Sequence, residues 1–122
     1  MIEIKNNVSP SEILKQISAD DFAIFNSETV KDRTWIVAYD GETAVGYISY
    51  TDATVRYPNK IGLKVICVHN DYKNQKIGNL LLKEFMNICN SIGKEIHVGY
   101  YEPDGEKFIR PKIEAHNYRV GW

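Results

Sequence analysis

The stretch from residue 64 to residue 93 constrains the fold more than any other part of the chain. A short apolar run at 64–68 leads into a polar turn rich in Lys and Asn, and a strongly apolar segment follows. Apolar side chains in that segment recur at helical spacing, at Ile77, Leu80, Leu81, Phe85 and Ile88. Gly93 stands where a left-handed residue commonly ends a helix. The pattern therefore predicts a strand, a loop and a helix in direct succession.

A loop of this kind predicts an anion site at the start of the helix. The first-turn amides of a helix have no partners within it and point outward, and the helix dipole adds partial positive charge. Lys73 and Lys76 add full charges, so the loop would suit a pyrophosphate. An ordinary strand-to-helix connection that binds nothing is the alternative, and these residues alone leave both open.

The remaining patterns place this unit in a mostly antiparallel sheet. From β-branched, aromatic or alternating apolar residues, we expect strands at 2–6, 34–39, 43–55, 61–69 and 94–101. An Asp-Gly signal at 40–41 joins the second and third strands as a hairpin, and Gly46 predicts a bulge or a close backbone approach. A helix start is expected at 9–12, where Ser precedes Pro and Glu. The last strand must lie parallel to the one before the long helix, which makes a β-α-β crossover.

The last twenty residues predict a turn, an interrupted helix and a tail. The segment 103–105 reads as a turn, and 106–116 favours a helix that Pro111 must either split or kink. Asn117 would close this helix in the left-handed conformation. Residues 118–122 would then finish the chain as a strand-like tail.

Composition is that of an ordinary globular protein. With 122 residues, 43% hydrophobic and 25% charged, the chain is expected to form a single domain over 1–122. A net charge of -1 offers no global field for nucleic acid, and no apolar run is long enough to span a bilayer, so we expect a soluble, cytoplasmic protein. Cys67 and Cys89 have no Cys or His at zinc spacing. No metal site is therefore expected, and buried free thiols are favoured over a catalytic cysteine, which lacks a supporting motif.

The order of elements over about 35–122 resembles the GCN5-related N-acetyltransferase (GNAT) family. WIVAYDGETAVGYI at 35–48 is similar to the family's central hairpin, VHNDYKNQKIGNLLL at 68–82 resembles its acetyl-CoA loop and helix, and HNYR at 116–119 resembles the end of its last helix. The resemblance implies an α/β (α+β) fold. Its mixed, mostly antiparallel central sheet would carry helices on both faces, and the β-α-β crossover would carry the acetyl-CoA loop.

The same resemblance implies a set of residues that bind acetyl-CoA. The backbone at Cys67 and Val68 would pair with the pantetheine arm, and the Val68 amide would polarise the thioester carbonyl. The loop and helix start would face the pyrophosphate, through Lys73, Asn74, Gln75, Lys76, Ile77, Gly78 and Asn79. The family pattern has glycine where this chain has Lys76. If the backbone there has positive φ, a Cβ costs about 1 kcal/mol, and binding is expected to survive in weakened form.

The resemblance assigns the catalytic groups less directly. Relatives commonly use a tyrosine of the last helix as the general acid, and the matching position here is Ile113. His97 and Tyr101 alternate onto one face of the strand after the helix, so they are the substitutes, His97 as base and Tyr101 as acid. Packing roles are the alternative for both side chains.

The implied activity is direct transfer of an acetyl group from acetyl-CoA to an amine, either of a small molecule or of a protein. One alternative is a GNAT-like module without turnover that binds CoA or a partner protein. A second is a structural interaction domain whose loop binds nothing. The aromatic Trp122 leaves a homodimer open, although a single apolar residue needs no such explanation.

Overall fold

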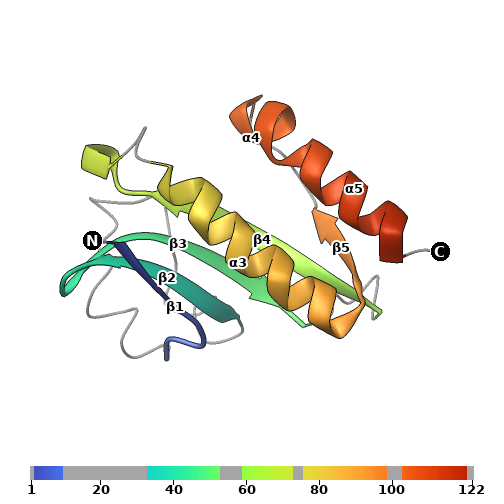
Figure 1. The fold of residues 1–122 in the computed structure, drawn as a ribbon, viewed down its shortest axis with the longest axis horizontal. Helices are drawn as coiled ribbons and strands as arrows, with labels where there is room; N and C mark the ends of the chain where they lie inside the picture. Colours follow the sequence, from blue (N-terminus) through green and yellow to red (C-terminus); the bar gives the residue numbers. More distant parts are fainter. Residues whose placement is uncertain (1, 10–32, 53–58, 73–75, 99–102, 121–122) are drawn as a thin grey trace.

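The structure is a computed structural model, and it describes residues 2–9, 33–52, 59–72, 76–98 and 103–120 (Figure 1). The strands are β1 (Ile2–Lys5), β2 (Thr34–Asp40), β3 (Thr43–Thr51), β4 (Lys60–Val68) and β5 (Glu95–Val98). The helices are the 3-10 turn η1 (Asn70–Tyr72), α3 (Ile77–Ile92), α4 (Pro103–Phe108) and α5 (Arg110–Val120). All five expected strands and the long helix are confirmed within the described residues, with β3 ending at Thr51; residues 53–55 and 99–101 of the expected strands lie outside them. The helix start expected at 9–12 lies mostly outside the described residues.

The strands form one sheet in the order β1-β2-β3-β4-β5. The first four pair antiparallel, and β5 joins β4 in parallel after the chain has crossed over through α3. Two neighbouring parallel strands need such a crossover, because a tight turn can join only antiparallel strands. The mixed, mostly antiparallel sheet and the β-α-β crossover are therefore confirmed.

Helix α3 crosses one face of the sheet and buries its apolar stripe there (Figure 1). Its buried side chains are Ile77, Leu81, Leu82, Phe85 and Cys89. The helix ends where predicted, since Gly93 adopts φ 75° and its N–H donates to the Cys89 carbonyl at 2.9 Å. No helix in the described part of the chain is long and apolar enough to cross a membrane.

The two faces of the sheet belong to two apolar clusters. The larger cluster lies under α3 and also includes Ile113, which brings α5 onto the same face beside β5. The smaller cluster lies on the opposite face, where Trp35 and Tyr47 are almost fully buried. Their rings contact each other with centroids 5.0 Å apart. Both described helices that pack on the sheet, α3 and α5, thus cover the same face.

The structure confirms both predictions for Gly46, a β-bulge and a close backbone approach. Val45 is the extra residue of a β-bulge, because Ala38 pairs with Gly46 whereas Tyr39 pairs with Ala44. A Cβ on Gly46 would lie 3.1 Å from Cγ2 of Ile77 and 3.2 Å from the carbonyl oxygen of Cys67. Glycine therefore lets β3 approach both β4 and the first turn of α3.

The end of the chain departs from the sequence prediction in two ways. The segment 103–105 is the first turn of α4, not a free turn, because proline suits the first helical positions where its missing N–H costs nothing. Pro111 splits the helical region as expected, with α5 starting at Arg110. The strand-like tail is wrong as far as Val120, because α5 continues to that residue.

The expected left-handed close at Asn117 is also wrong. Positive φ among the described non-glycine residues occurs at Asn7 and Lys76. The Asn117 side chain accepts from the Ile96 N–H at 2.6 Å and donates to the Ile96 carbonyl at 2.8 Å. The asparagine is therefore used to dock α5 onto β5, a contact that no local sequence pattern reveals.

Candidate functional site

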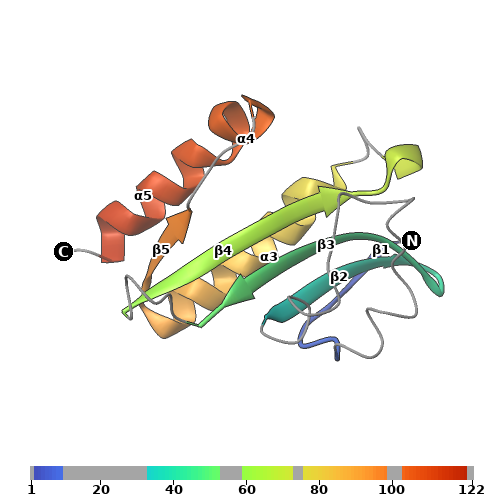
Figure 2. The ribbon, with the colours of Figure 1, turned by 180° about the vertical axis from the view of Figure 1, so that it is seen from behind.

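The sheet opens between β4 and β5. Their parallel pairing ends at Leu63 and Val98 in the described residues, while β4 continues to Val68. Lys64 is the extra residue of a β-bulge, because its two neighbours on β4 pair with consecutive residues of β3. A bulge bends its strand and increases the local twist. Figure 2 shows β4 and β5 diverging from their shared end.

The register shows which backbone groups face this opening. The His69 N–H donates to the Val45 carbonyl at 2.8 Å, directly beside the pair of Val68 with Gly46. In an antiparallel ladder, such a bond flanks a pair that exchanges no hydrogen bonds of its own. The N–H and C=O of Val68 therefore point away from β3, toward the opening. The same alternation turns the N–H and C=O of Ile66 in that direction.

Helix α3 begins beside the opening, at a residue with left-handed backbone. Lys76 has φ 62° and ψ 18°, and no side chain caps the helix at this position. The first helical bond runs from the Leu80 N–H to the Lys76 carbonyl at 3.1 Å. The amides of Ile77, Gly78 and Asn79 precede that bond and have no acceptor within the helix. Positive φ at Lys76 thus meets the condition under which its Cβ is costly.

A cavity of about 440 Å³ joins the opening to the start of α3. Its described lining comes from β4, from the first turns of α3 and from the joint of α4 and α5: Ile66, Gly78, Asn79, Leu82, Phe108, Ile109 and Lys112. The lining is mostly apolar, with an amide and an ammonium group as its polar members. Such a cavity suits a ligand with an apolar arm and an anionic end.

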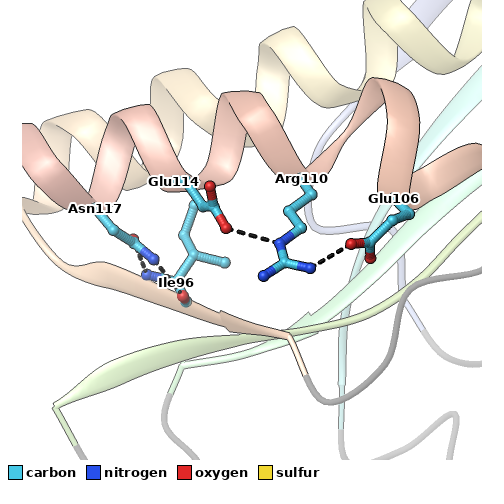
Figure 3. Close-up of polar contacts among 5 residues, drawn as sticks. All are labelled: Ile96, Glu106, Arg110, Glu114 and Asn117. Atoms are coloured by element: carbon cyan, nitrogen blue, oxygen red, sulfur yellow. Dashed lines mark hydrogen bonds and ion pairs between the residues drawn. The ribbon is translucent and has the colours of Figure 1, made fainter.

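The α4–α5 wall was missed by the sequence analysis, and polar contacts hold it in place (Figure 3). Arg110 bridges two carboxylates, those of Glu106 and Glu114, with Nε donating to Glu114 Oε1 at 2.7 Å. These hydrogen bonds raise the pKa of the guanidinium. The Ile109 carbonyl accepts from the amides of residues 112 and 113, which starts α5. The only sequence signal was an apolar pair before a proline.

The two residues expected on β4 face opposite sides. The Val68 side chain packs toward α3, and a Cβ on Gly78 would lie 3.9 Å from its Cγ2. Cys67 packs into the smaller cluster, and the register pairs it with Tyr47. Burial and the neighbouring thiol raise the pKa of Tyr47 above its ordinary value. Because Cys67 alternates with Val68 along β4, its backbone groups point toward β3. Its side chain lies on the face of the sheet opposite α3.

The structure places the expected catalytic residues only in part. His97 is half-buried on β5, paired in register with Gly62, and its neighbour Ile96 belongs to the core under α3. Tyr101 lies outside the described residues, as do loop residues 73–75. Ile113 is buried in the core and has no group that could donate a proton. The described lining of the cavity carries no hydroxyl or carboxylate.

Polar and aromatic contacts brace the turn that leads into the loop. The Asp71 N–H donates to Nδ1 of His69 at 3.1 Å, and the rings of His69 and Tyr72 meet edge to face. The Tyr72 hydroxyl donates to Asp40 at 2.8 Å, which raises the pKa of the phenol. These contacts tie the turn to the β2–β3 hairpin. Over the described ranges, no three His, Cys, Asp or Glu side chains are grouped to hold a metal ion.

A family model described as acetyltransferase (GNAT) domain matches residues 31–110 of the chain. The chain belongs to the GNAT family. The match covers the sheet from β2 to β5, the bulged strand and the whole of α3, so the resemblance noted from the sequence is confirmed. No protein with a curated description matches the chain in sequence.

Solved GNAT structures share the fold at low sequence identity. A GNAT family acetyltransferase from Streptococcus pneumoniae is 22% identical, with 92% of this chain and 86% of that chain covered and a TM-score of 0.67. The PaiA N-acetyltransferase from Thermoplasma acidophilum, solved in complex with coenzyme A, is 18% identical, with coverages of 93% and 88% and a TM-score of 0.63. The ribosomal-protein-S18-alanine N-acetyltransferase from Escherichia coli is 12% identical, with coverages of 99% and 77% and a TM-score of 0.67.

Proposed function

We propose that this GNAT protein binds acetyl-CoA between β4 and β5 and transfers the acetyl group directly to an amine. The observation that carries the proposal is that three features of the site lie close together. The opening of the sheet, the first-turn amides of α3, which have no acceptor within the helix, and the cavity of about 440 Å³ lie next to one another. A GNAT neighbour solved with coenzyme A supports the choice of ligand.

Each part of the site matches a part of acetyl-CoA. The backbone edge at Ile66 and Val68 suits the amides of a pantetheine arm, because it offers an N–H and a C=O at alternate residues of β4. The first-turn amides of α3 suit the pyrophosphate. Lys76 and the loop residues Lys73, Asn74 and Gln75 are the proposed supplement to those amides. Bound there, acetyl-CoA would supply the activated acyl group.

The Val68 amide is the proposed stabiliser of developing charge on the thioester oxygen. Its N–H is turned toward the opening by the register, and β3 fixes its direction through the neighbouring His69–Val45 bond. A donor that is oriented before the reaction costs no reorganisation when the charge appears. The chain thus needs no polar side chain at this position.

Proton transfer is assigned to the strand after α3. His97 would accept the proton that the amine loses, and Tyr101 would protonate the departing thiolate. His97 is proposed for the task because a ring nitrogen of neutral imidazole can accept a proton. His97 pairs in register with Gly62 of β4.

A GNAT module without turnover is the second candidate, and Ile113 favours it. This residue occupies the place of the usual acid and is buried in the core, so it cannot take over that role. The two candidates share cofactor binding and differ in acetyl transfer. Both differ from a structural domain, for which the loop would bind nothing.

The first test is the melting temperature of the purified protein with and without saturating acetyl-CoA. Ligand at 100 times its Kd adds about 2.7 kcal/mol to the native state, so a rise of several degrees is expected. Release of free CoA in the presence of candidate amines then separates the enzyme from the module. An unchanged melting temperature would refute both.

A matched pair of variants ties the binding to this site. Gly78→Trp would fill the cavity and abolish the shift. Gly78→Ala would keep it, because a Cβ at this position meets no atom closer than 3.9 Å. A shift that survives Gly78→Trp would place the ligand elsewhere.

A further inference from the structure

A second cavity lies away from the opening between β4 and β5. Its volume is about 570 Å³, and its described lining comes from β1, from the turn after it and from the β2–β3 hairpin, including Lys5, Asn6, Val8, Tyr39 and Glu42. The described linings of the two cavities have no residue in common. Val8 and Tyr39 belong to the smaller apolar cluster, so the second cavity lies on the face of the sheet opposite α3.

The second cavity carries a cation and an anion that are not paired with each other. The ion pairs of the described residues involve His69 and Arg110. Neither Lys5 nor Glu42 therefore has an ionic partner among those residues. The Lys5 ammonium lies 5.2 Å from the centroid of the Tyr39 ring. Because both charged side chains are exposed, a ligand with one cationic and one anionic end could pair with both.

The hairpin indicates how far apart the two ends of such a ligand would be. Lys5 pairs in register with Val37, and its ammonium reaches to Tyr39, two residues nearer the hairpin turn. Glu42 lies in that turn, directly before β3. At about 3.3 Å per residue, the turn lies about two residues, or about 7 Å, beyond Tyr39. An extended dipeptide spans about the same length, whereas a single α-amino acid carries both charges on one carbon.

The rest of the cavity suits the body of a short peptide. Val8 and the buried ring of Tyr39 give it an apolar floor. Two hydrogen bonds hold the turn after β1 in place. The Val8 N–H donates to the Trp35 carbonyl at 3.2 Å. The Asn6 side-chain amide donates to Glu84 of α3 at 2.8 Å, so the wall is formed before a ligand arrives.

We propose that this cavity binds a short zwitterionic peptide of about two residues, as a second ligand of the protein. The N-terminal ammonium of the peptide pairs with Glu42, and its C-terminal carboxylate pairs with Lys5. An apolar side chain on its last residue packs on Val8 and Tyr39, which lie on the Lys5 side of the cavity. None of these residues takes part in the proposed acetyl-CoA site, so the peptide binds whether or not acetyl-CoA does.

Calorimetric titration of the full chain with four probes tests this assignment. Alanyl-phenylalanine carries both charges, its C-terminal amide lacks the carboxylate, and its N-acetyl form lacks the ammonium. Free phenylalanine carries both charges on one carbon. Wild type is expected to bind the dipeptide, and to bind each of the other three probes about 10-fold more weakly, as for a lost hydrogen bond to a charged group.

Two neutral variants should separate the two ends of the ligand. Glu42→Gln should weaken the dipeptide and its amide about 10-fold and leave the N-acetyl form unchanged. Lys5→Gln should weaken the dipeptide and its N-acetyl form by a similar factor and leave the amide unchanged. Glu3→Gln is the control, because Glu3 is exposed on the same strand as Lys5 without lining the cavity. Its affinity for the dipeptide should stay within about twofold of wild type.

Circular dichroism should match wild type for all three variants, since each change is made at an exposed side chain. Absence of dipeptide binding at millimolar concentration would overturn the proposal. So would variants that leave the dipeptide affinity unchanged or weaken all four probes equally. Neither result would alter the thermal shift with acetyl-CoA, so the proposed function stands or falls separately.

Discussion

At Lys76 the chain accepts a backbone strain that glycine would avoid. A side chain at φ 62° costs about 1 kcal/mol, because the Cβ crowds the backbone. The same residue places a positive charge beside the first-turn amides of α3. Lys76 thus combines a strained backbone with a positive charge at the start of α3.

Lys76→Gly should stabilise the protein and weaken its binding of acetyl-CoA. Relief of the left-handed strain is expected to raise the free energy of unfolding by about 1 kcal/mol, measured by urea denaturation without ligand. Lys83→Gly is the control, because Lys83 is exposed in the interior of α3. That change should lower the free energy of unfolding by about 1 kcal/mol. A loss of stability at both positions would contradict strain at Lys76.

Cys89 should resist thiol reagents in the folded protein. Burial against the sheet raises the pKa of this thiol to about 12, so it stays protonated at pH 8. Alkylation at pH 8 followed by peptide mapping should find Cys89 unmodified until the protein is unfolded. The pKa of this thiol in the folded protein exceeds its ordinary value of 9.0, so its contribution to stability should fall as pH rises from about 9 toward 12. Rapid labelling of the native protein would show that α3 opens.

At the scale of elements, α3 and α5 differ in how well a sequence pattern predicts their packing on the sheet. Helix α3 was predictable because its apolar residues repeat with the helical period. Helix α5 buries only Ile113 and His116 among its described side chains, so its docking leaves no periodic signal. His116 instead contacts Asn90 Oδ1 at 2.8 Å and the Lys94 carbonyl at 2.7 Å. These partners lie in other elements, and a local reading of the tail could not find them.

Asn117→Ala should therefore loosen α5 from the sheet. The change removes both hydrogen bonds to the Ile96 backbone and leaves part-buried groups unpaired. We expect the free energy of unfolding to fall by about 2 kcal/mol, measured by urea denaturation. Tyr118→Ala, at a side chain that is 68% exposed, should change it by less than about 0.5 kcal/mol. Equal effects of the two changes would argue against the docking role.

At the scale of the whole molecule, the candidate site divides into a predictable and an unpredictable half. The side formed by β4 and α3 comes from one continuous stretch, so its residues could be named from the sequence. The opposite side comes from Phe108, Ile109 and Lys112, which reach the cavity through the docking of α4 and α5. The bulge at Lys64 lies where the described pairing of β4 with β5 ends, and the sequence carries no glycine or proline signal for it.

Deletion of Lys64 should close the site without unfolding the protein. The residues on either side, Leu63 and Val65, already pack on opposite faces of the sheet, so the deletion restores regular alternation and turns no side chain over. Circular dichroism should show a folded protein, and the thermal shift with acetyl-CoA should vanish. A deletion variant that still binds acetyl-CoA would show that the bulge does not create the opening.

The bulge also has a consequence for how such a site arises. A β4 without a bulge could continue a regular ladder with its neighbour along its whole length. The extra residue Lys64 lies where the described pairing of β4 with β5 ends, and a ligand with peptide-like amides would suit the N–H and C=O groups of β4 beyond that point. A single residue, Lys64, thus separates a regular β4 from the bulged strand beside which the ligand is proposed to bind.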